Sequence, residues 1–168
     1  MTAVAGSVFT AAQFNANVRD NLNQTGPALV TATGQILVAT GPNTLAARTP
    51  TSAALSTSDT TTSNSYTNLA STSGPAVTAV TGVYALVHVL ANCVCSSATN
   101  AALMSFTVTG ASSIASNDTR AVGSASQQAG GLFLMNSLTP GSNTFTAVYR
   151  TGSGTGTFSN RGITVIPL

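Results

Sequence analysis

The sequence predicts a mainly β protein, with a C-terminal antiparallel β-sandwich or jelly roll that follows a short N-terminal helix and an extended arm. The chain contains no Lys or Glu, which favour helices, and it is rich in Thr, Ser, Gly and Val, which favour strands and turns. The hydrophobic fraction is 43% and the net charge only +2, a balance that excludes a disordered chain. From residue 66 onward, short apolar runs alternate with Gly, Pro and Ser turns, without a helical pattern between them.

Residues 10–24 form the segment with the clearest helical pattern. Thr10 is expected to be the N-cap, and Gln13 stands at the position that completes a capping box. Phe9 before the cap and Phe14 after it fit a hydrophobic staple. One narrow apolar stripe follows at helical spacing: Ala11, Phe14, Val18 and Leu22.

An isolated helix of about four turns is marginal in water, so this stripe must dock on something. Its own domain, a trimer and a larger assembly are all open as the docking surface. Gly26-Pro27 is expected to end the helix. The candidate anchor and interface residues are Phe9, Phe14, Val18, Leu22 and Arg19.

The chain is predicted to have three parts. Residues 1–48 form an N-terminal anchor, in which two apolar runs between residues 29 and 41 are each closed by Thr-Gly and suggest a small β-element. Residues 49–65, dominated by Thr and Ser, are interpreted as a linker or extended arm. Residues 66–168 form the β-sandwich domain.

The longest predicted strand is Val83–Cys95, whose odd positions are small and apolar and are expected to face the core. The even positions mix Leu, Tyr, His and Asn. The other strand candidates are Ala76–Val80, Leu103–Thr109, Leu132–Asn136, Asn143–Arg150 and Gly162–Ile166, with Tyr66–Ala70 and Thr119–Ser124 weaker.

The sequence offers few groups for chemistry, and we expect no enzyme activity, no cofactor and no metal. His88 is the only histidine, it lies within a predicted strand, and the chain has no Gly-x-Ser-x-Gly motif. Cys93 and Cys95 point to the same strand face, which favours two buried free thiols, with a disulfide or an intersubunit site as alternatives. Arg150 and Arg161 are interpreted as solvated, with interface anchoring as the alternative.

Nucleic acid and membranes are not expected partners. The five Arg are scattered, aromatic residues make up 5% of the chain and Trp is absent, so neither a basic patch nor a stacking platform is present. The N-terminus does not show the pattern of a signal peptide. The longest apolar stretch, Val83 to Leu90, is interrupted by His88 and is too short to span a bilayer.

Three segments carry a resemblance to bacteriophage virion proteins: residues 7–22, residues 34–41 and residues 143–168. The first, Ser7 to Leu22, resembles an N-terminal anchor that reads "LTAADLN" and then "RDNL", with Phe9 here in place of Leu and Gln13-Phe14 in place of Asp-Leu. The second is similar to short β-segments that follow such anchors in tail-fibre-like proteins. The third looks like the C-terminal domain of phage tail and head-surface proteins.

This resemblance implies a homotrimer whose jelly-roll head is related in shape to the C1q/TNF class. The expected function is that of a structural virion protein forming decoration or cement projections on the particle. The alternative is a short tail fibre or minor tail protein that binds the host-cell surface. A surface-glycan hydrolase is a third and weaker hypothesis. The implied partners are copies of the chain and the major capsid or tail proteins, and the implied location is the virion, assembled in the bacterial cytoplasm.

Overall fold

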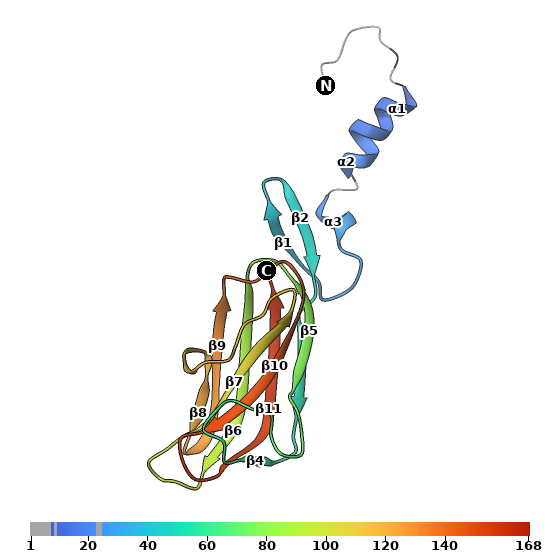
Figure 1. The fold of residues 1–168 in the computed structure, drawn as a ribbon. Coiled ribbons are helices and arrows are strands. Elements are labelled where there is room, and N and C mark those ends of the chain that lie inside the picture. Colours follow the sequence, from blue (N-terminus) through green and yellow to red (C-terminus); the bar gives the residue numbers. More distant parts are fainter. Residues whose placement is uncertain (1–7, 9, 23–24) are drawn as a thin grey trace. The chain divides into compact units, whose positions relative to one another are not determined.

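The computed structural model describes residues 8, 10–22 and 25–168 (Figure 1). The chain divides into two compact units, Met1–Arg48 and Thr49–Leu168. The described part of the first unit holds the helical segments and a hairpin, and the second is entirely β apart from one short 3₁₀ turn.

The helix of the first unit begins as the sequence predicts. Thr10 is the N-cap of α1 (Ala11–Phe14), where its Oγ1 accepts a hydrogen bond from the Gln13 N–H at 3.2 Å. The Thr10 N–H in turn donates to Gln13 Oε1 at 3.0 Å, which completes the capping box. Phe9, the expected first half of the staple, lies outside the described residues.

Beyond α1 the helix widens into a π-helical segment, η1 (Asn15–Arg19), and returns to α-helix in α2 (Asp20–Leu22). Asn17 and Asn21 each donate their side-chain N–H to the carbonyl four residues earlier, at 2.9 Å. Such local hydrogen bonds compete with the regular backbone ladder, and π segments are the usual form of a widened turn.

The expected end of the helix at Gly26-Pro27 is wrong. These residues instead begin a separate turn, α3 (Gly26–Leu29), in which Pro27 occupies the first helical positions. Proline is well tolerated there because the first N–H groups of a helix have no partner within it. The pair Gly26-Pro27 therefore begins a new helical turn, although such a pair often follows the end of a helix.

The small β-element is a hairpin of β1 (Ile36–Gly41) and β2 (Thr44–Arg48). Asn43 lies at its tip with a φ of 56°, in the left-handed region that Asn tolerates. Every described residue from 8 to 48 is half-buried or exposed. The described part of this unit therefore has regular secondary structure without a core of its own.

The second unit contains two antiparallel sheets. One has the order β5 (Ala76–Thr81), β10 (Gly141–Thr151), β7 (Ala102–Gly110) and β8 (Val122–Ser124). The other has the order β3 (Thr51–Leu55), β11 (Gly156–Pro167), β6 (Ala85–Cys95) and β9 (Ser126–Met135), and β4 (Asp59–Thr61) also pairs with β11. The short η2 turn (Asp118–Arg120) lies between β7 and β8.

The strand order is that of a jelly roll. With β4 set aside as an accessory strand, the first strand pairs with the last, β3 with β11, and the second with the seventh, β5 with β10. The third pairs with the sixth, β6 with β9, and the fourth with the fifth, β7 with β8. This nesting of antiparallel pairs wraps a folded ribbon of chain into two facing sheets. The predicted fold class is confirmed.

The segment 49–65 belongs to this fold, although the sequence suggested a linker. β3 pairs with β11 along Leu55↔Arg161 to Thr51↔Val165, and β4 pairs with the beginning of β11. Thr favours strands, but a Thr- and Ser-rich composition does not distinguish an edge strand from a linker. The weak candidate at residues 66–70 forms only a single bridge, Thr67 to Tyr149.

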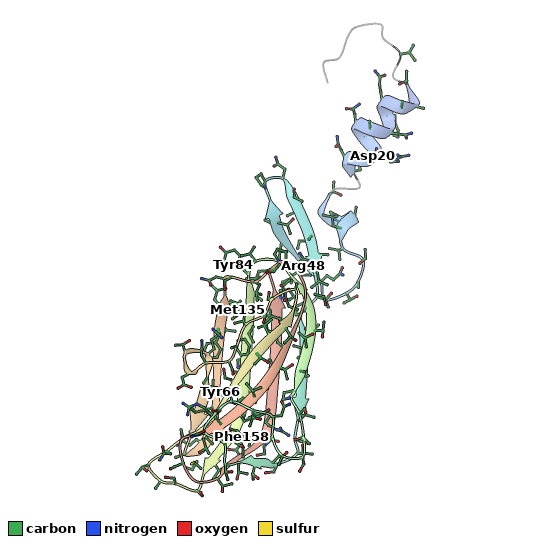
Figure 2. All side chains as sticks on the ribbon, in the orientation of Figure 1. Asp20, Arg48, Tyr66, Tyr84, Met135 and Phe158 are labelled. Atoms are coloured by element: carbon green, nitrogen blue, oxygen red, sulfur yellow. The ribbon has the colours of Figure 1, made fainter. Side chains whose placement is uncertain are left out.

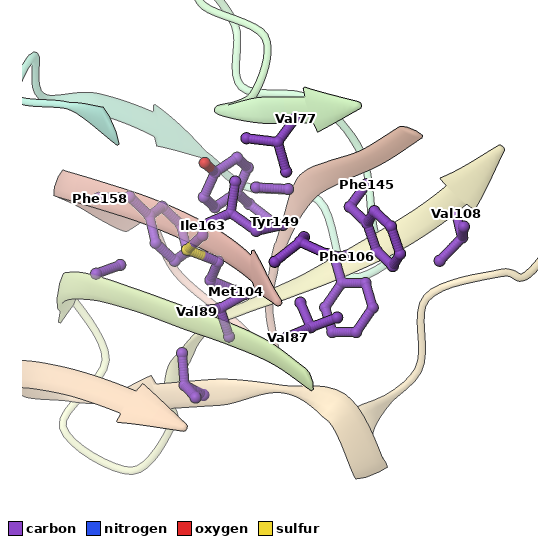
Figure 3. Close-up of a cluster of buried hydrophobic side chains, with 14 of the residues drawn as sticks. Val77, Val87, Val89, Met104, Phe106, Val108, Phe145, Tyr149, Phe158 and Ile163 are labelled. Carbon is purple, nitrogen blue, oxygen red and sulfur yellow. The ribbon is translucent and has the colours of Figure 1, made fainter. Parts of the chain in front are cut away.

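The core lies between the two sheets (Figure 3). The odd residues of β6 are buried, and the even residues are half-buried or exposed. The predicted orientation of this strand is therefore confirmed. Aromatic rings from several strands fill the middle, with Tyr149 and Phe158 4.8 Å apart between ring centroids, and Phe106 and Phe145 6.2 Å apart. Such tilted pairs contribute beyond the area that they bury.

A β-bulge in β11 brings one charged residue into this core. The pairing with β6 shifts register between Ser159 and Gly162, and Asn160 has a φ of 47°. Before the bulge the even residues of β11 face inward, and after it the odd residues do. The extra residue therefore turns the side chain of Arg161 to the inside, where its relative exposure is 0%.

The guanidinium of Arg161 holds two loops of the domain. Its Nη1 donates to Gly74 O at 3.2 Å, and its Nη2 donates to Thr57 O at 3.2 Å and to Thr72 Oγ1 at 3.0 Å. It also stands 5.5 Å from the ring centroid of Tyr149, whose hydroxyl donates to the same Gly74 O at 2.7 Å. The expectation that Arg161 is solvated is wrong, because the bulge turns its side chain into the core.

We expect the substitution Arg161→Ala to lower the free energy of unfolding by about 3 kcal/mol, because it opens a cavity and removes the hydrogen bonds that hold the loops around Thr57 and Gly74. Arg150→Ala is the matched control, since Arg150 belongs to the same β domain, in β10, but is only half-buried. Chemical denaturation followed by circular dichroism measures both. An equal loss for the two variants would contradict the structural role of Arg161.

Candidate interaction surfaces

The anchor residues lie on an exposed helix. Phe14 is 47% exposed and Leu22 60% exposed, while Val18 between them is half-buried. The wider turns of the π segment bring residues spaced four apart close to one line, so these three side chains share one side of the helix. Arg19 forms an ion pair with its neighbour Asp20, with 2.8 Å between Nη2 and Oδ1. This pair is exposed and contributes little to stability.

The outer surface of the five-stranded sheet is a larger apolar surface. We call it the apolar outer face, and it consists of Leu86, Leu90, Leu132, Leu134 and Ile166. Leu86 of β6 pairs with Leu134 on one side and with Ile166 on the other, so three strands contribute to one continuous apolar row. Leu132 and Leu134 are 60% and 58% exposed. Contiguous apolar surface of this kind marks interaction sites in soluble proteins.

His88 lies within the apolar outer face, half-buried between its neighbours. It pairs with Leu132 of β9 and with Thr164 of β11. The next row, Gly130, Leu90 and Gly162, contains no polar side chain. Figure 2 places Tyr84 and Met135 at one end of this sheet and Phe158 towards the other. The expected structural or interface role of His88 is compatible with this position.

The sequence pattern alone does not predict the apolar outer face. It predicts that the even positions of β6 point away from the core, but the residues that complete the surface come from β9 and β11. The available signal was the run Leu132-Phe133-Leu134-Met135, which is apolar on both strand faces. An apolar residue at every position of a strand means that both faces are covered by something.

Asp118 joins two other residues on the opposite sheet. Its carboxylate accepts hydrogen bonds from Arg150 Nη2 at 2.6 Å, from Arg150 Nε at 3.0 Å and from the Tyr66 hydroxyl at 2.9 Å. These bonds, that of Arg150 first, lower the pKa of Asp118 below its usual value. Burial and the carboxylate raise the pKa of Tyr66 to about 12. The expectation that Arg150 is solvated is therefore wrong, because its guanidinium is paired with the Asp118 carboxylate.

Asp59 secures the loop that Arg161 also binds. Its Oδ2 accepts hydrogen bonds from the backbone N–H groups of Ser71 and Thr72 and from Thr72 Oγ1, at 2.9 to 3.0 Å. Burial raises the pKa of this carboxyl, but these bonds and that from the Thr60 N–H outweigh it, so the pKa lies below its usual value. Thr72 thus links the carboxylate of Asp59 to the guanidinium of Arg161.

The two cysteines are both buried and free, as the strand spacing favoured. Burial raises the pKa of Cys93 to about 11. Cys95 Sγ lies 3.4 Å from Thr151 Oγ1 and 3.4 Å from Ser153 O. Within the described residues, no group of three or more His, Cys, Asp or Glu side chains could hold a metal ion.

No protein-family model matches the chain, and no curated protein is significantly similar to it. No helix among the described residues has the length and apolar character needed to cross a membrane.

We expect Asp59→Asn to lower stability at neutral pH, because an ionised carboxylate accepts several hydrogen bonds that the amide cannot reproduce. The pKa of Asp59 is lower in the folded chain than in the unfolded one, so its contribution is present above the unfolded value of about 3.9 and is lost as the pH falls further. Denaturation midpoints between pH 7 and pH 2 measure this contribution of the Asp59 carboxylate to stability.

The control is Asp20→Asn, which removes a carboxylate from the exposed ion pair in the other unit. The gap in stability between wild type and Asp59→Asn should narrow below about pH 4, whereas Asp20→Asn should follow the wild type. A gap for Asp59→Asn that stays constant down to pH 2 would contradict the assigned role of the carboxylate.

Proposed function

We propose that the chain is a structural virion protein of a bacteriophage, which forms homotrimeric decoration or cement projections on the particle surface. The observation that carries this proposal is the apolar outer face of the β domain, an uncharged surface of leucine and isoleucine side chains on a fold that already has a complete core. The resemblance of residues 7–22 and 143–168 to phage virion proteins supports the virion assignment.

The chemistry of the outer face favours a second copy of the chain as its partner. Burial of apolar surface contributes about 25 cal/mol of stabilising free energy per Å². The exposed part of the outer face contributes none of this free energy in an isolated subunit. Its five apolar residues carry no charge that would have to be desolvated on association. With a 5% charged fraction, the chain also has little electrostatic repulsion between copies. Self-association is the simplest way to cover this surface.

The first unit supports attachment to another component. Its helix is twelve residues long in the described range Ala11–Leu22, if α1, η1 and α2 are taken together, and none of these residues is buried. A helix of this length is marginal in isolation, so contacts outside the helix must stabilise it. In the proposed particle these contacts come from the capsid or tail, through Phe14, Val18 and Leu22.

The ionisable groups support a role without catalysis. Asp20 pairs with Arg19, Asp118 binds Arg150 and Tyr66, and Asp59 accepts backbone hydrogen bonds. Each carboxylate of the chain therefore has a structural partner. A glycosidase would need two carboxylates that face one substrate, and these three are committed elsewhere.

The double substitution Leu132→Asp/Leu134→Asp should convert the trimer to monomer, because two charges would have to be buried in the subunit contact. Both side chains are more than half exposed, so the fold of the isolated subunit should persist. Light scattering coupled to size exclusion measures the mass, and circular dichroism checks the fold. Val80→Asp, a similarly exposed position (55%) on the other sheet, is the control and should remain trimeric. A monomeric wild type at micromolar concentration would rule out the trimer.

Antibodies against residues 66–168 should label intact virions in immunogold electron microscopy. Gold over the whole head would support the decoration role, whereas gold only at the tail tip would replace it with a tail-fibre or minor tail protein. Virions without any gold would refute the virion proposal.

Recombinant chain with Leu22→Asp should fail to bind particles that lack the protein, while Asn21→Asp, which introduces the same charge beside it, should bind normally.

A further inference from the structure

β9 is an edge strand of the five-stranded sheet. It pairs with β6, and among the described residues no strand is hydrogen-bonded to its other side. The strand is ten residues long and contains neither a charged residue nor a proline. Natural proteins usually protect such edges with charges, proline or a covering segment, because exposed N–H and C=O groups can pair with another chain.

The register shows which groups face the open side. The Cys95 N–H donates to Ala125 O at 2.7 Å, so these opposite residues form a hydrogen-bonded pair. Hydrogen-bonded and non-hydrogen-bonded pairs alternate along an antiparallel ladder. The pairs Val87↔Phe133 and Ala85↔Met135 are therefore hydrogen-bonded, and Leu132 and Leu134 direct their backbone N–H and C=O groups away from β6.

A groove runs beside this part of the edge. It has a volume of about 380 Å³ and lies between β9 and the segment that contains η2. Its walls come from Leu132 to Ser137 on one side and from Ile114, Thr119 and Arg120 on the other. Just before this part of the strand, Gly131 lies against β8, since a Cβ on Gly131 would come within 2.8 Å of Val122. The open edge and the groove thus coincide at the C-terminal half of β9.

Arg120 supplies a positive charge to the groove. Its guanidinium stands 5.7 Å from the ring centroid of Phe106 and donates one hydrogen bond to Ala115 O. Its Nε has no hydrogen-bond partner, and the ion pairs of the described residues involve Arg19 and Arg150 instead. A half-buried guanidinium without a carboxylate partner is suited to bind one.

The chain itself has no free side-chain carboxylate to offer. Its three acidic residues are Asp20, Asp59 and Asp118, and each is engaged as described above. The complementary charge is therefore expected from a different protein and not from a side chain of a second copy of this chain.

We propose that the groove between β9 and η2 binds an extended acidic segment of another protein, which adds a strand to the open edge of β9 and places a carboxylate on Arg120. Main-chain hydrogen bonds to Leu132 and Leu134 supply affinity, and the Arg120 contact supplies the preference for an acidic residue. This binding mode does not depend on the proposed virion role.

The test is a selection of random twelve-residue peptides displayed on a carrier, with the full chain immobilised. Enriched peptides should contain Asp or Glu within a run of β-branched or aromatic residues. Arg120→Gln should weaken binding of a selected peptide by about tenfold or more, because it removes the charge-assisted contact, while Arg120→Lys should retain most of it.

Two variants of β9 separate strand addition from ordinary side-chain binding. Leu134→Pro removes an N–H that faces the open edge and should abolish binding, whereas Leu134→Ala keeps the N–H and should bind. In hydrogen-exchange experiments the bound peptide should slow the exchange of the Leu132 and Leu134 amides. A selection without acidic enrichment, or peptides that bind Leu134→Pro as well as the wild type, would overturn the proposal.

Discussion

A single extra residue in β11 determines how the β domain is closed. The bulge at Ser159–Gly162 reverses the alternation of the strand and directs Arg161 into the interior. A buried guanidinium is costly unless its donors are satisfied. The loops around Thr57 and around Thr72–Gly74 supply the acceptors, so they are held against the sandwich. Asp59 compensates the charge through Thr72 and fixes the second of these loops from the other side.

The strand β6 shows how one sequence pattern serves two purposes. Its odd residues, all small or medium-sized, pack against the aromatic side chains that come from β7 and β10. Its even residues bear Leu86, His88 and Leu90, which belong to the outer surface. A strand with one solvated face would carry polar residues at those positions. The two leucines at these positions connect the fold to the proposed self-association.

Local features of the fold could be predicted, whereas those that depend on distant pairing could not. The capping box of Thr10 and Gln13 needs only two residues three apart, and the inward face of β6 needs only alternation. The bulge in β11, the strands within residues 49–65 and the π segment leave no comparable local signal, because register and partner choice decide them. Among the candidate interface residues, the helix stripe can be predicted from its spacing in the sequence. Leu132 and Leu134 can be assigned to an interaction surface only when β6 and β9 are known to be neighbours.

The two units differ in what stabilises them. The β domain has buried residues from seven of its strands and the loops between them, and therefore a core that can support folding of the single chain. The described part of the first unit has a capped helix, a hairpin and no buried residue. A two-stranded hairpin and a twelve-residue helix are each marginal in water, so their stability must rise when a partner covers them. Binding and ordering of this unit are then thermodynamically coupled, and the affinity of the anchor is reduced by the free energy needed to order it.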